Sequence, residues 1–408
     1  MIENAFVLPC GLTLPNRIVK AAMTERLAGV DGRATRAHAR LFERFAHGGA
    51  GMLITGNVAV DSAHLEAPGN VWIDRENSLD ALSAWARAGR SAQGAMIMQI
   101  NHAGRQTPRS VSAHSLAPSA IPLKFGRYFS TPRAMTEDEI EATAEQFVYA
   151  AAIAAKAGFD GVQVHAAHGY LLSQFLSPRV NCRDDQWGGA LENRARLLLD
   201  IVRAIRASAA ARFAVGVKLN VGDFIKGGLE PEDAAQTAAW LGLSGVDFIE
   251  LSGGTHERAV SFGFGDEAES PKEAYFRQQA ETIRKATHVP LILTGGMRHR
   301  STMTTVIREN VCDLIGMARP LAIEPDLPRR LVRNETQAAR SVRLKLPRPP
   351  RDGLAELAWR REQLARMARG KEPKLTISPK LAVIRMLMQE QSFAAKRARA
   401  QRLAARSS

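Results

Sequence analysis

The stretch TEDEIEATAEQFVYAAAIAAKAGFDGVQVH, residues 136–165, places a helix signal directly before a strand signal. Its TEDE start is typical of a capping box, and the following residues have helical spacing, so we expect a helix from Thr136 to Ala157. The short apolar run GVQVH at 161–165 is typical of a strand that is buried on both faces. Together they form one unit of an alternating α/β fold.

Seven more short apolar runs precede or follow this unit, and most of them lead into a stretch with helical spacing, such as Leu191 to Ala207. The runs lie at 17–22, 51–55, 95–99, 214–219, 246–250, 291–294 and 313–317. Eight such units over about 320 residues favour a closed (β/α)8 TIM barrel over an open, doubly wound sheet. The chemistry of such a barrel lies at the C-terminal ends of its strands, so the residues just after each run are the candidates.

The alternation of strand and helix signals ends near Leu344. The Pro- and Arg-rich segment LPRPPRDG follows from residue 346. We therefore expect a barrel over residues 1–343 and a basic helical C-terminal extension over residues 344–408. In the extension, Asp352 is a candidate N-cap and Gly370 a candidate C′ residue of one helix, and a second basic segment runs from Pro379 to Ser408. One face of this helix is expected to carry Leu354, Leu357, Arg361, Leu364 and Ala368.

The net charge of +14 is concentrated in this extension. From Arg351 onward there are 14 of the 55 basic residues but 5 of the 41 acidic ones, so the barrel is not expected to bind nucleic acid. Two interpretations of the extension stay open: a helix that packs on the barrel or on a neighbouring subunit of a homo-oligomer, or a module for anionic lipid or RNA. The second rests on five cations close to Phe393 and Leu403, namely Lys396, Arg397, Arg399, Arg402 and Arg406.

The N-terminal segment MIENAFVLPCGLTLPNR lacks a basic stretch followed by an apolar core, and no apolar run is long enough for a membrane span. We therefore expect a cytoplasmic protein. Cys10, Cys182 and Cys312 lie far apart, which argues against a zinc or iron–sulfur site.

The end of the fourth strand carries the clearest chemical signal. His165 and His168 are three residues apart, and Tyr170 follows two residues later. Two imidazoles can donate hydrogen bonds to one carbonyl or nitro oxygen, and a phenol can deliver a proton. No carboxylate or third histidine joins the pair at metal-ligand spacing, so no metal is expected; an isolated histidine pair could equally be buried and hydrogen-bonded.

The whole stretch HAAHGYLLSQFLSPRVNCRDDQWGGALENRAR, residues 165–196, resembles the signature of the old yellow enzyme family, and the resemblance extends from about Leu8 to Leu327. It implies an FMN-dependent barrel enzyme that uses NADH or NADPH to reduce the C=C bond of small α,β-unsaturated carbonyl or nitro compounds. His165 and His168 would then anchor the substrate oxygen, and Tyr170 would donate the proton.

The resemblance also assigns residues to the cofactor. Ala22, Met23 and Thr24 match flavin-contacting positions, Lys218 would face the electron-rich edge of the flavin, and Gly56 and Gln99 suit a flat ring and its pyrimidine edge. The phosphate would lie after the last two strands, where the relevant residues are Gly295, Gly296, Ala318 and Arg319. The family usually has glycine where this chain has Ala318, but the backbone amide remains.

Two other functions stay open at this point. One is a flavin dehydrogenase or demethylase that acts on an amine or ring substrate with the same barrel. The other is a flavin-free aldolase or isomerase in which Lys218 forms a Schiff base. Ser252, Gly253 and Gly254 are expected to line the mouth, and the glycine-rich segment 261–268 is a candidate lid.

Overall fold

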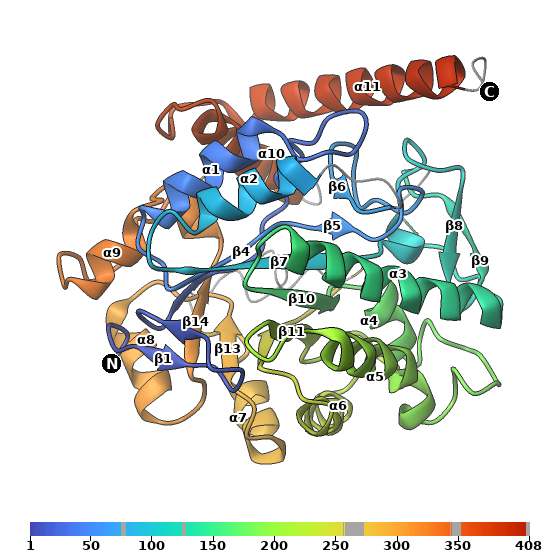
Figure 1. The fold of residues 1–408 in the computed structure, drawn as a ribbon, viewed down its shortest axis with the longest axis horizontal. Coiled ribbons are helices and arrows are strands. Elements are labelled where there is room, and N and C mark those ends of the chain that lie inside the picture. Colours follow the sequence, from blue (N-terminus) through green and yellow to red (C-terminus); the bar gives the residue numbers. More distant parts are fainter. Residues whose placement is uncertain are drawn as a thin grey trace.

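A computed structural model describes residues 1–74, 79–124, 128–255, 257, 273–342, 344 and 352–404, and the candidate lid at 261–268 lies outside these residues. Eight parallel strands form a barrel with helices around it (Figure 1). The strands are β3 (Ile18–Lys20), β4 (Met52–Ile54), β7 (Ala95–Asn101), β10 (Gly161–Ala166), β11 (Ala214–Asn220), β12 (Phe248–Ser252), β13 (Leu291–Thr294) and β14 (Leu314–Met317). Each lies on one of the eight apolar runs, so the predicted TIM barrel is confirmed.

The barrel closes because each strand pairs with the next one and β14 pairs with β3. Within this ring β10 pairs with both β7 and β11, and all of these ladders are parallel. Register places His165 opposite Lys218, and Lys218 opposite Glu250. Side chains from distant parts of the sequence therefore meet at one level of the barrel.

The N-terminal end of the barrel is closed by a hairpin that sequence patterning did not predict. Its strands are β1 (Phe6–Val7) and β2 (Thr13–Leu14), which pair antiparallel. Leu8 and Leu14 pack with interior strand residues such as Phe248, and all three side chains are buried. This apolar plug leaves the opposite end, where the strands terminate, for polar chemistry.

The helical layer follows the predicted capping and spacing. The helices are α1 (Arg36–Ala46), α2 (Leu79–Gly89), α3 (Glu137–Lys156), α4 (Leu171–Leu176), α5 (Leu191–Ser208), α6 (Pro231–Leu243), α7 (Arg277–Ala286), α8 (Arg300–Arg308) and α9 (Leu327–Val332). At the start of α3, the Glu139 N–H donates to the Thr136 hydroxyl and the Thr136 N–H donates to the Glu139 carboxylate. This is the predicted capping box, and Ala157 is the C-cap, as the sequence indicated.

Shorter elements shape the loops of the barrel. Strands β5 (Val58–Ala59) and β6 (Val71–Trp72) extend the sheet beside β7, while β8 (His114–Ala117) pairs with β9 (Thr131–Ala134). Two 3-10 helices lie in the loops after β7 and β14, namely η1 (Gly104–Gln106) and η4 (Arg319–Ala322). These pieces set the backbone path of the loops at the C-terminal ends of the strands.

The C-terminal extension forms two helices, α10 (Asp352–Ala368) and α11 (Pro379–Ala404). Gly370, two residues after the last residue of α10, has φ of +74°, as expected for a C′ glycine. Of the residues expected on one face of α10, Arg361, Leu364 and Ala368 are buried, whereas Leu354 is 46% exposed. The buried surface of α10 instead includes Trp359, because the helix packs between the barrel and α11.

None of the helices within the described residues is both long and apolar enough to cross a membrane. Helix α11 runs along one edge of the molecule beside α10 (Figure 1). The extension is therefore packed on the barrel, which is the first of the two interpretations above.

Stability should fall in acid partly because of His38. This imidazole is buried in α1 against Trp85, with ring centroids 4.6 Å apart, and accepts a hydrogen bond from the Thr35 N–H. Burial lowers the pKa of His38 to about 3. The unfolded chain therefore binds a proton at this imidazole near pH 6.5, whereas the folded chain does not bind it until the pH approaches 3. The contribution of neutral His38 to the free energy of unfolding is therefore complete above pH 6.5 and is lost as the pH falls from about 6.5 to 3.

Replacing His38 with Gln should remove about one proton from the slope of unfolding free energy against pH in this window, or about 1.4 kcal/mol per pH unit. Urea unfolding at several pH values measures it. The same substitution at His47, which is exposed at the C-terminal end of α1, is the matched control. An unchanged slope for H38Q would contradict the assignment.

Candidate active site

Three side chains from the end of β10 and the turn that follows it lie together at the C-terminal end of the barrel strands. The ring of His165 lies 4.9 Å from that of Tyr170 and 5.2 Å from that of His168, measured between centroids. His168 and Gly169 both have positive φ, at 61° and 75°, so the chain turns sharply before Tyr170. The backbone N–H of His168 donates to the side-chain oxygen of Asn220, and this hydrogen bond links the turn to the end of β11.

The surroundings of His165 favour a neutral imidazole that can donate one hydrogen bond. Burial lowers its pKa well below the usual value, and the nearby charges of His168 and Lys218 add to the effect. Its Nδ1 accepts the Ala167 N–H at 3.2 Å, so the ring proton lies on Nε2. His168 reaches the Ser252 hydroxyl through its own Nε2 at 2.8 Å. Ser252, predicted to line the mouth, thus contacts the histidine pair.

Tyr170 is a phenol that keeps its proton. Burial raises its pKa well above 10, and the negative charge of Glu66 adds to the shift. Its hydroxyl donates to Glu66 Oε2 at 3.4 Å, and Glu66 in turn accepts from the Asn57 amide. Sequence reasoning did not identify Glu66, because it lies in a loop with no strand pattern of its own.

Lys218 is not free in the barrel. Its Nζ lies 2.9 Å from Glu250 Oε1, and both side chains are almost fully buried. Glu250 also accepts from Gln163 and from the Thr294 hydroxyl, each at 2.8 Å. Sequence reasoning missed Glu250, although a carboxylate inside a buried strand always requires partners.

Two further buried charged residues were also missed. Lys20, inside β3, donates to the Ile54 carbonyl at 2.7 Å, and Glu25 accepts the Gly56 N–H at 2.7 Å. Burial lowers the pKa of Lys20 to about 8 and raises that of Glu25 to about 7. Lys20 Nζ also lies over two phenylalanine rings of α1, so this charge is held between the barrel and its helical layer.

Gly56 lies against the turn formed by Ala22, Met23 and Thr24, so the structure brings these four predicted positions together. A Cβ on Gly56 would lie 2.2 Å from Glu25 and 2.5 Å from the Met23 carbonyl. The glycine was predicted to leave room for a flat ring, but the close approach observed is to this turn. Packing within the chain is thus sufficient to explain Gly56.

The residues of the mouth fit a flavin. Gln99 donates to Asn57 at 2.6 Å, yet its buried Oε1 has no hydrogen-bond partner among the described residues. A buried amide oxygen without a donor is costly, and a flavin pyrimidine edge offers an N–H. Thr24, whose hydroxyl accepts from Asn70, lies on the adjacent loop.

The predicted phosphate residues also lie together. Gly295 and Gly296 have φ of 135° and 73°, and Arg319 opens η4. Arg319 Nη2 lies 3.5 Å from the Tyr275 hydroxyl, and its Nη1 lies 3.8 Å from Glu356 of α10. A helix of the extension thus reaches the arginine that was assigned to the phosphate, which the sequence did not indicate.

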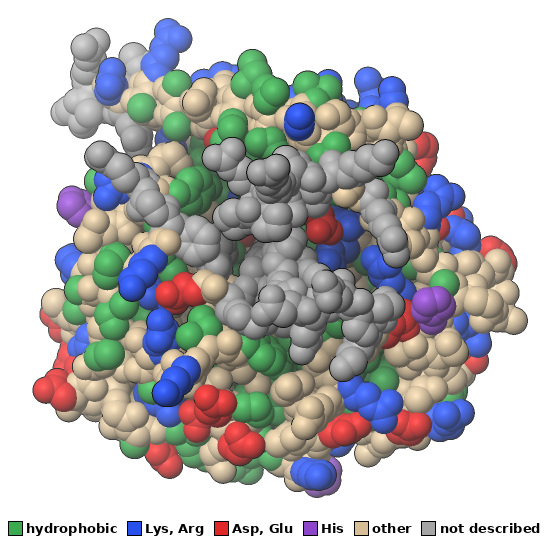
Figure 2. Space-filling view, turned by 180° about the vertical axis from the view of Figure 1, so that it is seen from behind, with side chains coloured by type: hydrophobic (Ala, Val, Ile, Leu, Met, Phe, Trp, Pro, Cys, Tyr) green, Lys and Arg blue, Asp and Glu red, His purple; other side chains and the backbone are tan. Residues whose placement is uncertain are grey.

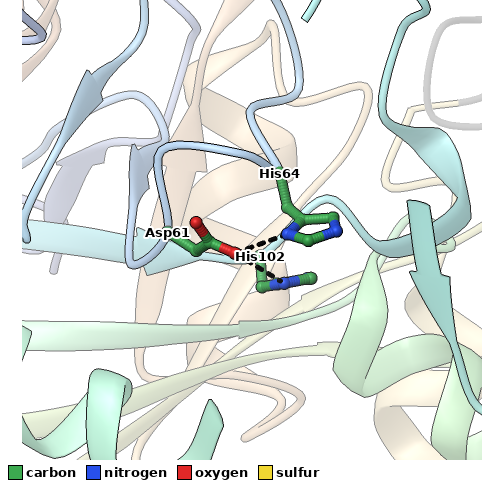
Figure 3. Close-up of side chains that lie close together, drawn as sticks. All are labelled: Asp61, His64 and His102. Atoms are coloured by element: carbon green, nitrogen blue, oxygen red, sulfur yellow. Dashed lines mark hydrogen bonds and ion pairs between the residues drawn. The ribbon is translucent and has the colours of Figure 1, made fainter. Parts of the chain in front are cut away.

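A cluster of Asp61, His64 and His102 lies in the loop after β5 and at the end of β7 (Figure 3). His64 Nδ1 lies 2.5 Å and His102 Nε2 lies 3.9 Å from Asp61 Oδ2, and the two rings stack. Because His102 Nδ1 accepts the Gly104 N–H, the proton of its neutral ring lies on Nε2, facing Asp61. Of the two rings, only that of His64 is within hydrogen-bond distance of the carboxylate, and this bond, together with the stacking of the two rings, links the loop after β5 to the end of β7.

Comparison with known proteins identifies the family. A family model described as NADH:flavin oxidoreductase / NADH oxidase matches residues 10–337. The chain belongs to this family. Membership confirms the old yellow enzyme resemblance and makes the protein an FMN-dependent oxidoreductase with NADH or NADPH as hydride donor. The flavin-free aldolase or isomerase is thereby excluded.

Relatives within the family share most of the chain. The NADH-dependent flavin oxidoreductase iliE of Hypocrea jecorina is 38% identical over 355 residues, covering 80% of this chain and 88% of that protein. The enzyme named iccE from Talaromyces variabilis is 37% identical over 376 residues, covering 86% and 91%. Among solved structures, the old yellow enzyme homologue of Zymomonas mobilis is 30% identical with a TM-score of 0.71, covering 84% and 95%.

Proposed function

We propose that this flavin oxidoreductase reduces the activated C=C bond of α,β-unsaturated carbonyl or nitro compounds. One observation carries the proposal: a neutral imidazole donor, His165, lies against a buried phenol, Tyr170, that keeps its proton. A hydrogen-bond donor beside a proton donor suits a substrate that gains negative charge on oxygen and then a proton on carbon.

The roles of the residues follow from their positions. His165 and His168 would donate hydrogen bonds to the substrate oxygen and draw electron density away from the double bond. Tyr170 would deliver its proton to the α-carbon, while Glu66 holds the phenol in place. FMN, when bound, supplies the hydride after accepting one from NADH or NADPH.

We further propose which residues hold FMN. The pyrimidine edge would be held by Thr24 and Gln99, with Ala22, Met23 and Gly56 beside the ring, and the Lys218–Glu250 pair would face the electron-rich edge. The phosphate would be held by Gly295, Gly296, Ala318 and Arg319.

Replacing Lys218 with Met should weaken FMN binding about 10- to 100-fold, because it removes a cation from beside the ring and leaves Glu250 buried alone. Titration of the apoprotein with FMN, followed by quenching of flavin fluorescence, measures this. The unpaired carboxylate should also lower stability by about 3–5 kcal/mol. The exposed Lys226, replaced in the same way, is the matched control.

The double variant K218M/E250Q separates the two effects. Removing both charges should restore much of the lost stability, because no unpaired charge stays buried, but it should not restore FMN affinity. Full recovery of FMN binding in the double variant would show that Lys218 only neutralises Glu250.

The reaction class is tested by anaerobic half-reactions. The enzyme reduced with NADH or NADPH should be reoxidised by an enone, with a saturated ketone as product. The alternative, a dehydrogenase or demethylase of an amine or ring substrate, predicts that the organic substrate and not the nicotinamide coenzyme bleaches the flavin. Slow reduction by both coenzymes together with fast reduction by an amine would replace the proposal with this alternative.

We also propose that the enzyme acts in the cytoplasm on small molecules and forms a homo-oligomer. The support for an oligomer is that α11 exposes Leu381, Ile384, Leu387 and Met388. Figure 2 shows hydrophobic and basic side chains close together along the edge of the molecule where α11 lies. Light scattering of the purified enzyme measures the subunit number.

A further inference from the structure

The C-terminal extension reaches the proton-donor side of the mouth. Glu390 of α11 forms an ion pair with Arg26, and both side chains are about nine-tenths buried. Arg26 Nε lies 3.8 Å from Glu66 Oε1, and Glu66 accepts the Tyr170 hydroxyl. A chain of four side chains therefore connects α11 to the proposed proton donor.

Helix α11 also holds the loop that carries Glu66. Arg397 donates to the Ser62 carbonyl at 2.8 Å, and its guanidinium stacks over the Trp72 ring at 4.9 Å. Phe393 packs against the small cluster of Ala59, Leu65 and Trp72. Since Asp61 and its two histidines brace the start of this loop (Figure 3), Glu66 is fixed from both sides.

Near these residues, the buried Arg361 of α10 lacks, within the described part of the chain, the acceptors that a buried guanidinium requires. Its side chain is 8% exposed, yet it makes no hydrogen bond or ion pair with any described residue, and its Nη1 is fully buried. Its pKa is influenced by the charges of Arg26, Glu390, Glu362 and Glu66. Burial raises the pKa of Tyr128, and the charge of Arg361 opposes that rise. Burial, followed by the repulsion of Arg26, lowers the pKa of Arg361 to about 10.

The acidic residues nearby are already engaged elsewhere. Glu390 is bound to Arg26, Glu66 is bound to Asn57 and Tyr170, and Glu362 contacts Arg369 and Arg385. A buried guanidinium without acceptors is destabilising, and a carboxylate or phosphate supplies two oxygens that match its fork of N–H groups. The region lacks a second acceptor as well, because the buried Nε of Arg26 also has no hydrogen-bond partner among the described residues.

We propose that Arg361 binds an anionic oxygen group, a carboxylate or a phosphate, on the molecule that occupies the mouth beside Tyr170. The extension would then be a specificity element of the enzyme and not only a packing element. The proposal rests on the proposed function insofar as Tyr170 marks the substrate side. Two sources can supply the group: the carboxylate of an acidic enone, or a phosphate of the nicotinamide coenzyme.

The first arm of the test compares an acid with its neutral analogue. Cyclohexenones bearing carboxyalkyl side chains of increasing length, and their methyl esters, are titrated against the oxidised holoenzyme, with binding followed by the flavin spectrum. At the best length, the native enzyme should bind the acid more tightly than the ester. Arg361→Gln should weaken acid binding by about 10- to 100-fold and leave ester binding unchanged, as expected for loss of a charge-assisted hydrogen bond.

Two further variants refine this arm. Arg361→Lys keeps the charge without the fork and should retain part of the preference for the acid. Arg369→Gln removes a charge from the region just after the same helix and should leave both affinities unchanged. If R361Q fails to fold, the acid and ester titrations of the native enzyme and of R361K still decide the question.

The second arm measures flavin reduction by NADH and NADPH as a function of coenzyme concentration. If R361Q raises the concentration needed for half-maximal rate about tenfold or more while acid binding is unchanged, the bound group is a coenzyme phosphate. The proposal is overturned if R361Q affects neither arm, or if it weakens acid and ester equally. An enzyme that reduces no alkene would defeat the proposed function, whereas the binding titrations would still decide the role of Arg361.

Discussion

Replacing Tyr170 with Phe should slow reduction of enones by about 100- to 10,000-fold while leaving flavin reduction by the nicotinamide coenzyme nearly unchanged. The hydroxyl is the group that would give its proton to the α-carbon, and its raised pKa keeps it protonated at neutral pH. Phenylalanine retains the ring packing against His165 and removes only the acid. Stopped-flow measurement of the two half-reactions separates the steps.

The pH dependence gives this prediction a second readout. A group with a raised pKa is protonated below that pKa, so proton delivery by Tyr170 should not decline between pH 6 and 9. Tyr149→Phe, at a partly exposed position of α3, is the matched control and should change neither half-reaction. Equal slowing of both half-reactions by Y170F would instead indicate that the phenol supports the flavin site.

The barrel could be predicted from the sequence because parallel strands buried on both faces appear as continuous apolar runs. The start of α3 could also be predicted, because the capping box of Thr136 involves residues only three positions apart. The segment from His165 to Tyr170 could also be picked out as a candidate, since its three polar side chains lie within six residues. Local signals therefore sufficed for the fold, whereas the roles proposed for these three side chains came from the family resemblance.

The charged partners could not be predicted, because their positions depend on how distant segments come together. Glu250 meets Lys218 through strand register, and Glu66 meets Tyr170 through a loop. One signal was nevertheless available: Lys20 and Glu250 lie inside or at the end of apolar runs, where a charge requires a partner. Similarly, nothing local in the extension indicates that Glu390 reaches Arg26.

Replacing Trp359 with Ala should lower the free energy of unfolding by about 3–5 kcal/mol. This side chain of α10 is fully buried between the barrel residue Ile323 and Ala382 and Met386 of α11, and its indole N–H donates to the Ile377 carbonyl at 2.9 Å. Truncation leaves a cavity where three elements meet and removes that hydrogen bond. Urea unfolding monitored by circular dichroism measures the loss, with the exposed Leu354→Ala on the same helix as control.

The same variant tests whether the extension and the barrel are one cooperative unit. Leu364 and Met367 of α10 belong to the main hydrophobic core, and Arg360 donates to the Arg319 carbonyl at 3.1 Å. Loosening α10 should therefore weaken FMN retention as well as stability, and unfolding should remain a single transition that coincides with FMN release. If W359A instead melted the extension in a separate early transition with FMN still bound, α10 would be an independent appendage, and its arginines would have no part in the active site.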